Sequence, residues 1–166
     1  MNMCEYKGTL YPELQKEGYA AQWCMPFAKK ILEGRTRGMD IGCNRKEWAF
    51  PGADAIDIMF DDEYHALNLP FNDAEYIFSS HCLEHITDWV AVLNHWHEHL
   101  DSSGILFLYL PHYHQKYWRP WNNPKHVNIL SPELLEDYFE SGGWRNWYVT
   151  RGYDLNDSFY AIAEKI

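Results

Sequence analysis

The chain has 166 residues, a length that predicts a single domain. Hydrophobic residues make up 46% of it and charged residues 23%, a balance that excludes a wholly disordered chain. Its 14 Lys and Arg residues against 24 Asp and Glu residues give a net charge of −10. This charge repels phosphates and argues against a nucleic-acid partner. No apolar run reaches the roughly 18 residues of a membrane-spanning helix, so no membrane partner is expected.

The N-terminal segment and the cysteines bear on the cellular compartment. Residues 1–18 have neither a basic start nor an apolar stretch, so they do not resemble a secretion signal, and we expect a loosely ordered lead-in there. The cysteines lie far apart and form no Cys-x-x-Cys pair, which is typical of reduced thiols rather than of disulfides. We therefore expect a soluble, cytoplasmic protein. The cysteines are Cys4, Cys24, Cys43 and Cys82.

The first half of the sequence predicts one helix and three strands. Apolar residues at helical spacing indicate a helix over 26–33, and Gly34 is placed to end it. Short apolar segments bounded by turn residues then predict strands at 38–42, 53–58 and 75–80. Such a series is typical of a domain that combines buried strands with covering helices.

The second half alternates helices and strands. A single apolar stripe predicts a helix over 88–100, and a turn at 101–104 leads into an uninterrupted apolar strand at 105–110. Another helix is expected from its cap Ser131 to the glycines at 142–143, and the end of the chain indicates two more strands. This pattern predicts a three-layer α/β domain whose sheet is mostly parallel, with an antiparallel pair at the C-terminal edge.

Small and polar residues follow each of the four predicted parallel strands. They stand at 42–44, 57–58, 79–81 and 111–112. Ligands of open parallel sheets bind beyond the carboxyl ends of the strands, where the strand order reverses. The sequence therefore predicts a binding site at this edge.

These segments together resemble a known family. GMDIGCN is similar to an acidic-x-Gly-x-Gly loop, AIDI to a strand with a terminal acid, and LNLPFNDAEYIFSSHCLEHITDW to a Leu-Pro-Phe, strand, Ser-Ser and Leu-Glu-His run. HWHEHLDSSGILFLYLPH and SPELLEDYFESGGW are similar to later elements of the same family. On these residues, chiefly 38–112, the chain resembles the class I S-adenosylmethionine-dependent methyltransferases.

The resemblance implies a single Rossmann-like domain over 1–166, S-adenosylmethionine as the cofactor, and methyl transfer as the activity. Asp57 follows Gly42 at close to the roughly 20-residue separation of a ribose-binding acid in dinucleotide folds, although an Asp here could instead cap the next turn. By resemblance, Asp40 and Gly42 lie at the methionine end, with Cys43 and Asn44 in the same loop. The remaining expected contacts are Asp57 to the ribose, Ile58, Ala66 and Leu67 to the adenine, and Ser79 to the amino-acid moiety, unless Ser79 and Ser80 merely end a strand.

Two departures from the family pattern keep another function open. Asn44 and Lys46 stand where the family loop usually has glycines, and the short interval between Asp57 and Tyr76 leaves the usual helix, strand and helix shortened or missing. Asn tolerates positive φ better than most residues do. The alternative is a non-catalytic binding or scaffold protein built on the same fold.

Catalysis requires a methyl acceptor held in line with the sulfonium, for which positioning supplies most of the rate. We expect a small acceptor that is not a nucleic acid, with the hydroxyl of a sugar or metabolite as a candidate, and His112, His81 or His85 as candidate bases. The connection over 113–130 is a candidate lid, or else a loop that packs its own aromatic residues. Its candidate binding residues are Lys116, Tyr117, Trp118, Arg119 and Trp121.

The run from His81 to His85 also matches the His-x-x-Glu-His pattern of a zinc hydrolase, with both histidines on one face of a helical turn. Some relatives in the resembled family hold a divalent metal with a Glu-x-x-Glu-His run, of which only Glu84 and His85 would carry over. Because short motifs match by accident, we expect these residues to orient the loop and we assign no metal. His95, His97 and His99 are expected on a solvated helix face.

Overall fold

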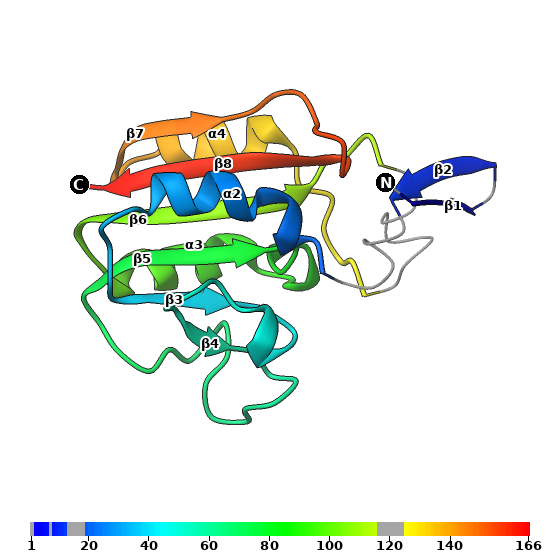
Figure 1. Ribbon diagram of the computed structural model, residues 1–166. Coiled ribbons are helices and arrows are strands. Elements are labelled where there is room, and N and C mark those ends of the chain that lie inside the picture. The colour runs from blue at the N-terminus through cyan, green and yellow to red at the C-terminus, as the bar shows by residue number, and fades with distance from the viewer. Residues whose placement is uncertain (1, 7, 13–18, 116–124) are drawn as a thin grey trace.

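A six-stranded sheet forms the centre of the molecule, in the order β4-β3-β5-β6-β8-β7 (Figure 1). The computed structural model describes residues 2–6, 8–12, 19–115 and 125–166. The strands of the sheet are β3 (Gly38–Ile41), β4 (Asp54–Ile56), β5 (Ala74–Ser80), β6 (Leu100–Pro111), β7 (Trp144–Val149) and β8 (Ser158–Lys165).

The strand directions confirm the predicted sheet. β3 pairs in parallel with β4 and with β5, and β5 pairs in parallel with β6. β8 is antiparallel to both β6 and β7, which makes the antiparallel pair at the C-terminal edge. The chain runs from β3 to β4 on one side and then crosses to β5 on the other. The strand order therefore reverses at β3, the place where open α/β sheets bind ligands.

Helices cover both faces of the sheet (Figure 1). α2 (Ala21–Ile31) lies on one face, and α3 (Trp89–His99) and α4 (Pro132–Glu140) lie on the other. The carboxylate of Asp88 accepts a hydrogen bond from the Ala91 N–H (3.0 Å), and the hydroxyl of Ser131 accepts one from the Leu134 N–H (3.4 Å). These side-chain caps satisfy backbone donors at the helix starts, and the Ser131 cap confirms the prediction from the sequence.

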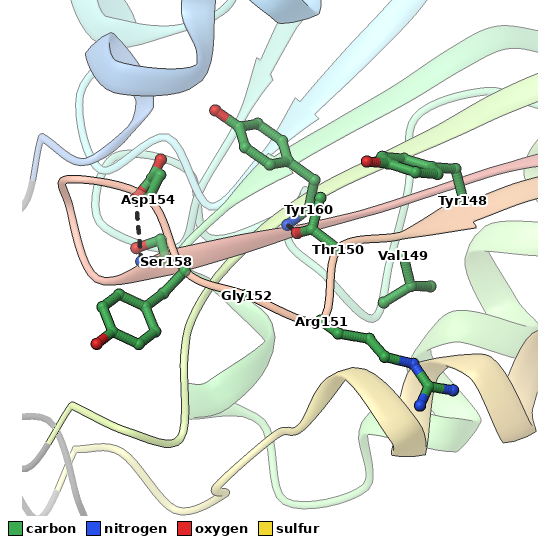
Figure 2. A pocket seen from close by; sticks show the side chains of 9 residues that line it. Tyr148, Val149, Thr150, Arg151, Gly152, Asp154, Ser158 and Tyr160 are labelled. Carbon is green, nitrogen blue, oxygen red and sulfur yellow. Dashed lines mark hydrogen bonds between the residues drawn. The ribbon is translucent and has the colours of Figure 1, made fainter.

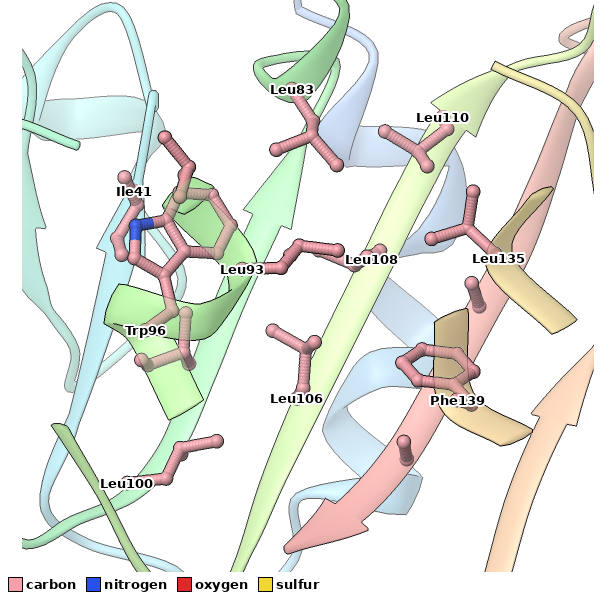
Figure 3. Packing of buried hydrophobic residues seen from close by; sticks show 14 of the residues in the cluster. Ile41, Leu83, Leu93, Trp96, Leu100, Leu106, Leu108, Leu110, Leu135 and Phe139 are labelled. Atoms are coloured by element: carbon pink, nitrogen blue, oxygen red, sulfur yellow. The ribbon is translucent and has the colours of Figure 1, made fainter. Parts of the chain in front are cut away.

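The two faces of the sheet have separate hydrophobic cores. On one face, Leu93 and Trp96 of α3 and Leu135 of α4 pack against Leu106 and Leu108 of β6 (Figure 3). On the other face, aromatic residues of the central strands pack against α2. Apolar cover on both sides explains why these strands have nearly continuous hydrophobic sequences.

Several elements differ from the predictions. α2 begins at Ala21, upstream of Pro26, because burial of Cys24 against the sheet extends the helix through the proline. β6 begins at Leu100, and the predicted turn at 101–104 lies within an irregularity of its pairing with β5. The N-terminal lead-in contains an antiparallel hairpin of β1 (Met3–Tyr6) and β2 (Thr9–Pro12), which the sequence analysis missed.

The segment between β4 and β5 confirms one expectation. Residues 57–73 contain neither a helix nor a strand, only an isolated bridge between His65 and Asn68. The usual helix, strand and helix are missing there. Within the part of the chain that the structure describes, no helix has the length and apolarity that a membrane span requires.

Gly42 is required at the end of β3 by its conformation and by its neighbour. Its φ is +84°, and a Cβ at this position would lie 2.4 Å from both the Cβ and the Sγ of Cys82. Gly52 has the same conformation, with φ +85°, but nothing within 4 Å of an added Cβ. A comparison of alanine substitutions at Gly42 and Gly52 therefore distinguishes the cost of backbone strain from the cost of steric overlap.

We expect Gly42→Ala to destabilise the protein more than Gly52→Ala does. Both variants incur roughly 1–2 kcal/mol of left-handed strain, and Gly42→Ala adds an overlap worth about 1–3 kcal/mol more. Urea unfolding of both variants measures the difference. Equal losses of unfolding free energy would show that Cys82 does not confine Gly42.

Candidate functional site

The segments that follow β3, β4 and β5 lie at one edge of the sheet, where these strands end (Figure 1). Gly42 follows β3, Asp57 follows β4, and His81 follows β5. The three strands are parallel neighbours, so their carboxyl ends share this edge. The topology therefore brings together side chains that are far apart in the sequence.

Asp57 joins the loops that follow β3 and β4. Its Oδ2 accepts a hydrogen bond from the Asn44 N–H (2.6 Å), and its Oδ1 accepts one from the Met59 N–H (2.8 Å). Asn44 adopts φ +64°, a left-handed conformation that Asn tolerates. The carboxylate thus caps its own turn, as the simpler interpretation has it, and also holds the loop at 42–44. It is half-buried, and each oxygen has a further lone pair for a ligand hydroxyl.

The loop after β3 presents backbone rather than side chains. The Gly42 N–H donates to the Ile56 carbonyl (2.8 Å), and the Cys43 side chain is buried. Burial raises the pKa of the Cys43 thiol to about 12, so it is no nucleophile at neutral pH. The two cations of the loop rest on aromatic rings: the Arg45 guanidinium lies 4.5 Å from the Trp48 ring centre, and the Lys46 ammonium lies 5.1 Å from that of Phe60.

Asp40 is buried beneath this loop. Only 1% of it is exposed, its Oδ2 accepts a hydrogen bond from the Phe50 N–H (2.7 Å), and its Oδ1 has no partner. Burial raises the pKa of Asp40 to about 7, and the hydrogen bond from Phe50 opposes that rise. Asp40 therefore holds the loop from below rather than presenting a fully charged carboxylate at the surface.

The predicted adenine side is apolar and open. Ile58 and Leu67 are 67% and 59% exposed, and both belong to the segment that follows Asp57. Ala66 is half-buried, and its carbonyl accepts a hydrogen bond from the Trp96 indole N–H (2.8 Å), which fastens the segment to α3. An exposed apolar surface beside a carboxylate suits a ligand in which a flat apolar group is attached to a group that carries hydroxyls.

Ser79 does not reach the edge. Its side chain is fully buried and its hydroxyl donates to the Ile41 carbonyl (2.7 Å). The hydrogen bond ties β5 to β3, which agrees with the simpler interpretation of Ser79 as the end of a strand. The expected contact of the Ser79 side chain with the amino-acid moiety is therefore wrong.

Two of the three candidate bases are held inside the protein by hydrogen bonds from their rings. His112 is 4% exposed, its Nδ1 accepts from the His114 N–H (3.1 Å), and its Nε2 lies 3.2 Å from the Arg151 carbonyl. Nε2 of His81 lies 2.8 Å from the Ser158 hydroxyl, and burial lowers the pKa of His81 to about 3. Neither imidazole is arranged to take a proton from an acceptor at this edge.

His85 and Glu84 lie on the short 3₁₀ helix η2 (Leu83–His85). His85 is partly exposed, and its Nδ1 lies 2.8 Å from the Lys125 carbonyl, while its Nε2 faces the buried Glu84. His81 precedes η2 and has φ +51°, so it does not share a helix face with His85. The predicted His-x-x-Glu-His arrangement of a zinc hydrolase on one helical turn is therefore wrong.

A family model described as a methyltransferase domain matches residues 13–149. The chain belongs to this family. Comparison with curated protein sequences gives no significant match. The family assignment therefore rests on a match to most of the chain, including every strand end described above.

Solved structures share the fold of this methyltransferase domain at low sequence identity. A SAM-dependent methyltransferase from Thermotoga maritima has a TM-score of 0.67 and 16% identity, over 88% of this chain and 89% of that one. One from Archaeoglobus fulgidus has a TM-score of 0.64 and 18% identity, over 92% and 98%. Human N-acetylserotonin methyltransferase in complex with SAM has a TM-score of 0.63 and 10% identity, over 92% and 54%.

A cavity of about 400 Å³ lies at the outer end of the β7–β8 hairpin (Figure 2). Figure 2 shows Tyr148, Tyr160 and Asp154 on one side of the hairpin, while Arg151 points to α4, where it pairs with Glu136 (2.6 Å). The cavity is not predicted from the sequence, because its only local signal is the presence of tyrosines along two strands. The candidate lid residues Lys116, Tyr117, Trp118, Arg119 and Trp121 lie outside the described residues.

We expect Asp40→Asn to remove a pH dependence of stability. The folded protein holds a proton on Asp40 up to about pH 7, whereas the unfolded chain releases it near the ordinary pKa of 3.8. The Asp40 contribution to the unfolding free energy should therefore fall by roughly 1.4 kcal/mol per pH unit between these values and stay level above them. The amide oxygen of Asn can still accept from Phe50.

Urea unfolding of both proteins at pH 5 and pH 8 measures this effect. From pH 5 to pH 8, the unfolding free energy of the variant should rise relative to that of the wild type by on the order of 2–3 kcal/mol. Parallel pH profiles of the two proteins would show that Asp40 is already ionised in the folded state.

Proposed function

We propose that this methyltransferase domain binds S-adenosylmethionine at the ends of β3 and β4 and transfers its methyl group to a small acceptor. The observation that carries the proposal is Asp57, a half-buried carboxylate tied to the 42–44 loop at the point where the strand order reverses. Membership of the family and the S-adenosylmethionine complex of the human structural neighbour support the same cofactor.

Each part of the cofactor has a matching surface at this edge. The carboxylate of Asp57 accepts hydrogen bonds from the ribose hydroxyls, a strong interaction because the acceptor is charged. Ile58 and Leu67 provide apolar contact for the adenine ring. The half-buried 42–44 loop adjoins the methionine portion, with Asp40 buried nearby.

A small acceptor fits the remaining features of this edge. The net charge of −10 disfavours a polyanionic partner, and the tyrosine-lined cavity of about 400 Å³ is within the size range of small-molecule sites. We propose this cavity as the acceptor site, with the hydroxyl of a sugar or metabolite as the acceptor group. His81 and His112 already make hydrogen bonds inside the protein. Methyl transfer therefore relies on positioning of the two reactants rather than on a histidine base.

Asp57→Asn should weaken S-adenosylmethionine binding at least about tenfold, because an amide cannot accept from both ribose hydroxyls as a carboxylate does. Isothermal titration calorimetry with S-adenosylmethionine and S-adenosylhomocysteine measures the dissociation constants. Asp54→Asn is the matched control, since Asp54 is exposed at the start of β4, the strand that Asp57 follows. Folded wild-type protein that gives no heat with either compound would overturn the proposal.

Methyl transfer separates an enzyme from a non-catalytic scaffold of the same fold. The protein is incubated with S-adenosylmethionine carrying a deuterated methyl group and with fractions of small metabolites, and mass spectrometry detects the labelled product. Tyr148→Ala should lower product formation at least about fivefold while cofactor binding is unchanged, because the cavity loses an aromatic wall. Cofactor binding without transfer to any fraction would favour the scaffold.

A further inference from the structure

Glu84, His85 and His126 converge beside the end of β5. Their potential ligand atoms all lie within 4.8 Å of one another. Glu84 and His85 come from η2, whereas His126 belongs to the segment before α4, which lies far away in the sequence. A fourth group, His81, has its Nδ1 3.7 Å from Glu84 Oε1. The fold therefore gathers a carboxylate and three imidazoles at one place.

Glu84 is a buried acid. It is 1% exposed, and neither carboxylate oxygen accepts a hydrogen bond from the residues that the structure describes. Its Oε1 lies 3.9 Å from the Nε2 of His85, and this distance and the 3.7 Å to His81 are longer than hydrogen bonds. A buried carboxylate with no partner is strongly unfavourable, so this arrangement calls for a bound cation or a proton.

The protonation of His85 and His81 follows from the hydrogen bond that each ring makes on the side away from Glu84. In both rings the nitrogen nearer Glu84 carries a lone pair and no hydrogen. A carbonyl only accepts, so the Nδ1 of His85 carries the hydrogen that bonds the Lys125 carbonyl, and the Nε2 is unprotonated. The Ser158 hydroxyl donates to the Asn156 carbonyl (3.0 Å), so the Nε2 of His81 donates to Ser158 and its Nδ1 is unprotonated. Both nitrogens therefore face the carboxylate as acceptors.

The backbone holds the two segments of the cluster together. The N–H groups of Val127 and Asn128 donate to the Glu84 carbonyl (2.9 and 3.1 Å), and the Asn128 amide donates to the Ile86 carbonyl. These bonds place His126, which is 3% exposed, against η2. The bond from His85 Nδ1 to the Lys125 carbonyl fixes one ligand ring from outside, as is typical of metal sites in proteins.

We propose that Glu84, His85 and His126 bind a divalent transition-metal ion. Two imidazoles and a carboxylate are the donor types that Zn²⁺ and its neighbours in the first transition row prefer. Bonds of roughly 2.0–2.2 Å place two ligands of one ion no more than about 4.2 Å apart. The 3.9 Å between Glu84 Oε1 and His85 Nε2 lies within this limit. The 4.8 Å within which all the ligand atoms lie is slightly above it, so binding would include a small side-chain rotation. Three protein donors leave at least one position for water.

A bound cation would give the Glu84 carboxylate the partner that it lacks among the described residues. It would also bind the lone pair that the Nε2 of His85 directs at that carboxylate. The inference does not depend on the cofactor or acceptor assignment, because it is tested by metal content alone.

Metal binding is measured on the full chain after treatment with a chelator. The protein is dialysed against buffered Zn²⁺ or Mn²⁺, and mass spectrometry of the elements counts ions per chain. We expect about one Zn²⁺ or Mn²⁺ per wild-type chain, and at least a tenfold weaker affinity after His126→Ala or Glu84→Gln. His99→Ala, a histidine of α3 outside the cluster, is the control and should bind as the wild type does.

A second measurement guards against variants that do not fold. Zn²⁺ should raise the melting temperature of the wild type and of His99→Ala, but not that of His85→Ala, whose side chain is partly exposed and whose loss the fold should tolerate. Folded wild-type protein that binds neither ion would overturn the proposal. Unchanged affinity and unchanged thermal shift in the cluster variants would do the same.

Discussion

Parallel pairing of β3 with β4 and with β5 is the constraint on which the candidate site depends. It brings the ends of three strands to one edge, where the Asn44 N–H donates to Asp57 and the Ser79 hydroxyl donates to the Ile41 carbonyl. The first bond fixes the loop that would surround the cofactor, and the second holds two strands in register. Because β3 is only four residues long, these side-chain bonds supplement a short backbone ladder.

Two buried acids set the electrostatic character of this edge. Asp40 and Glu84 are each 1% exposed, and each has at least one carboxylate oxygen without a hydrogen-bond partner. Burial of such groups lowers stability when they are charged, and proteins retain them chiefly where a ligand or ion provides the missing partner. Asp40 lies under the proposed cofactor loop, and Glu84 lies in the proposed metal cluster. Each of the two acids therefore lies where a proposed ligand or ion would supply the partner that its carboxyl group lacks among the described residues.

Local sequence patterns predicted the fold well wherever a short-range signal exists. Ser131 is a helix cap as expected, a helix begins beside Asp88, and the apolar strand at 105–110 lies at the centre of the sheet. Predictions failed where long-range packing overrides a local signal. Pro26 indicated a helix start, yet burial of residues before it extends α2 upstream, and the expected turn after α3 became the irregular first part of β6.

The sequence by itself determined the α/β class, the order of the elements and the small and polar residues that end the parallel strands, because these depend on periodicity and on neighbouring residues. Only the tertiary structure decided which of those residues are buried and which lie open at the edge of the sheet. Ser79 and His112 turned out to be buried and engaged, while His126 joined Glu84 and His85. Nothing within the sequence near His126 indicates that contact, because it arises when backbone hydrogen bonds fold a distant segment onto η2.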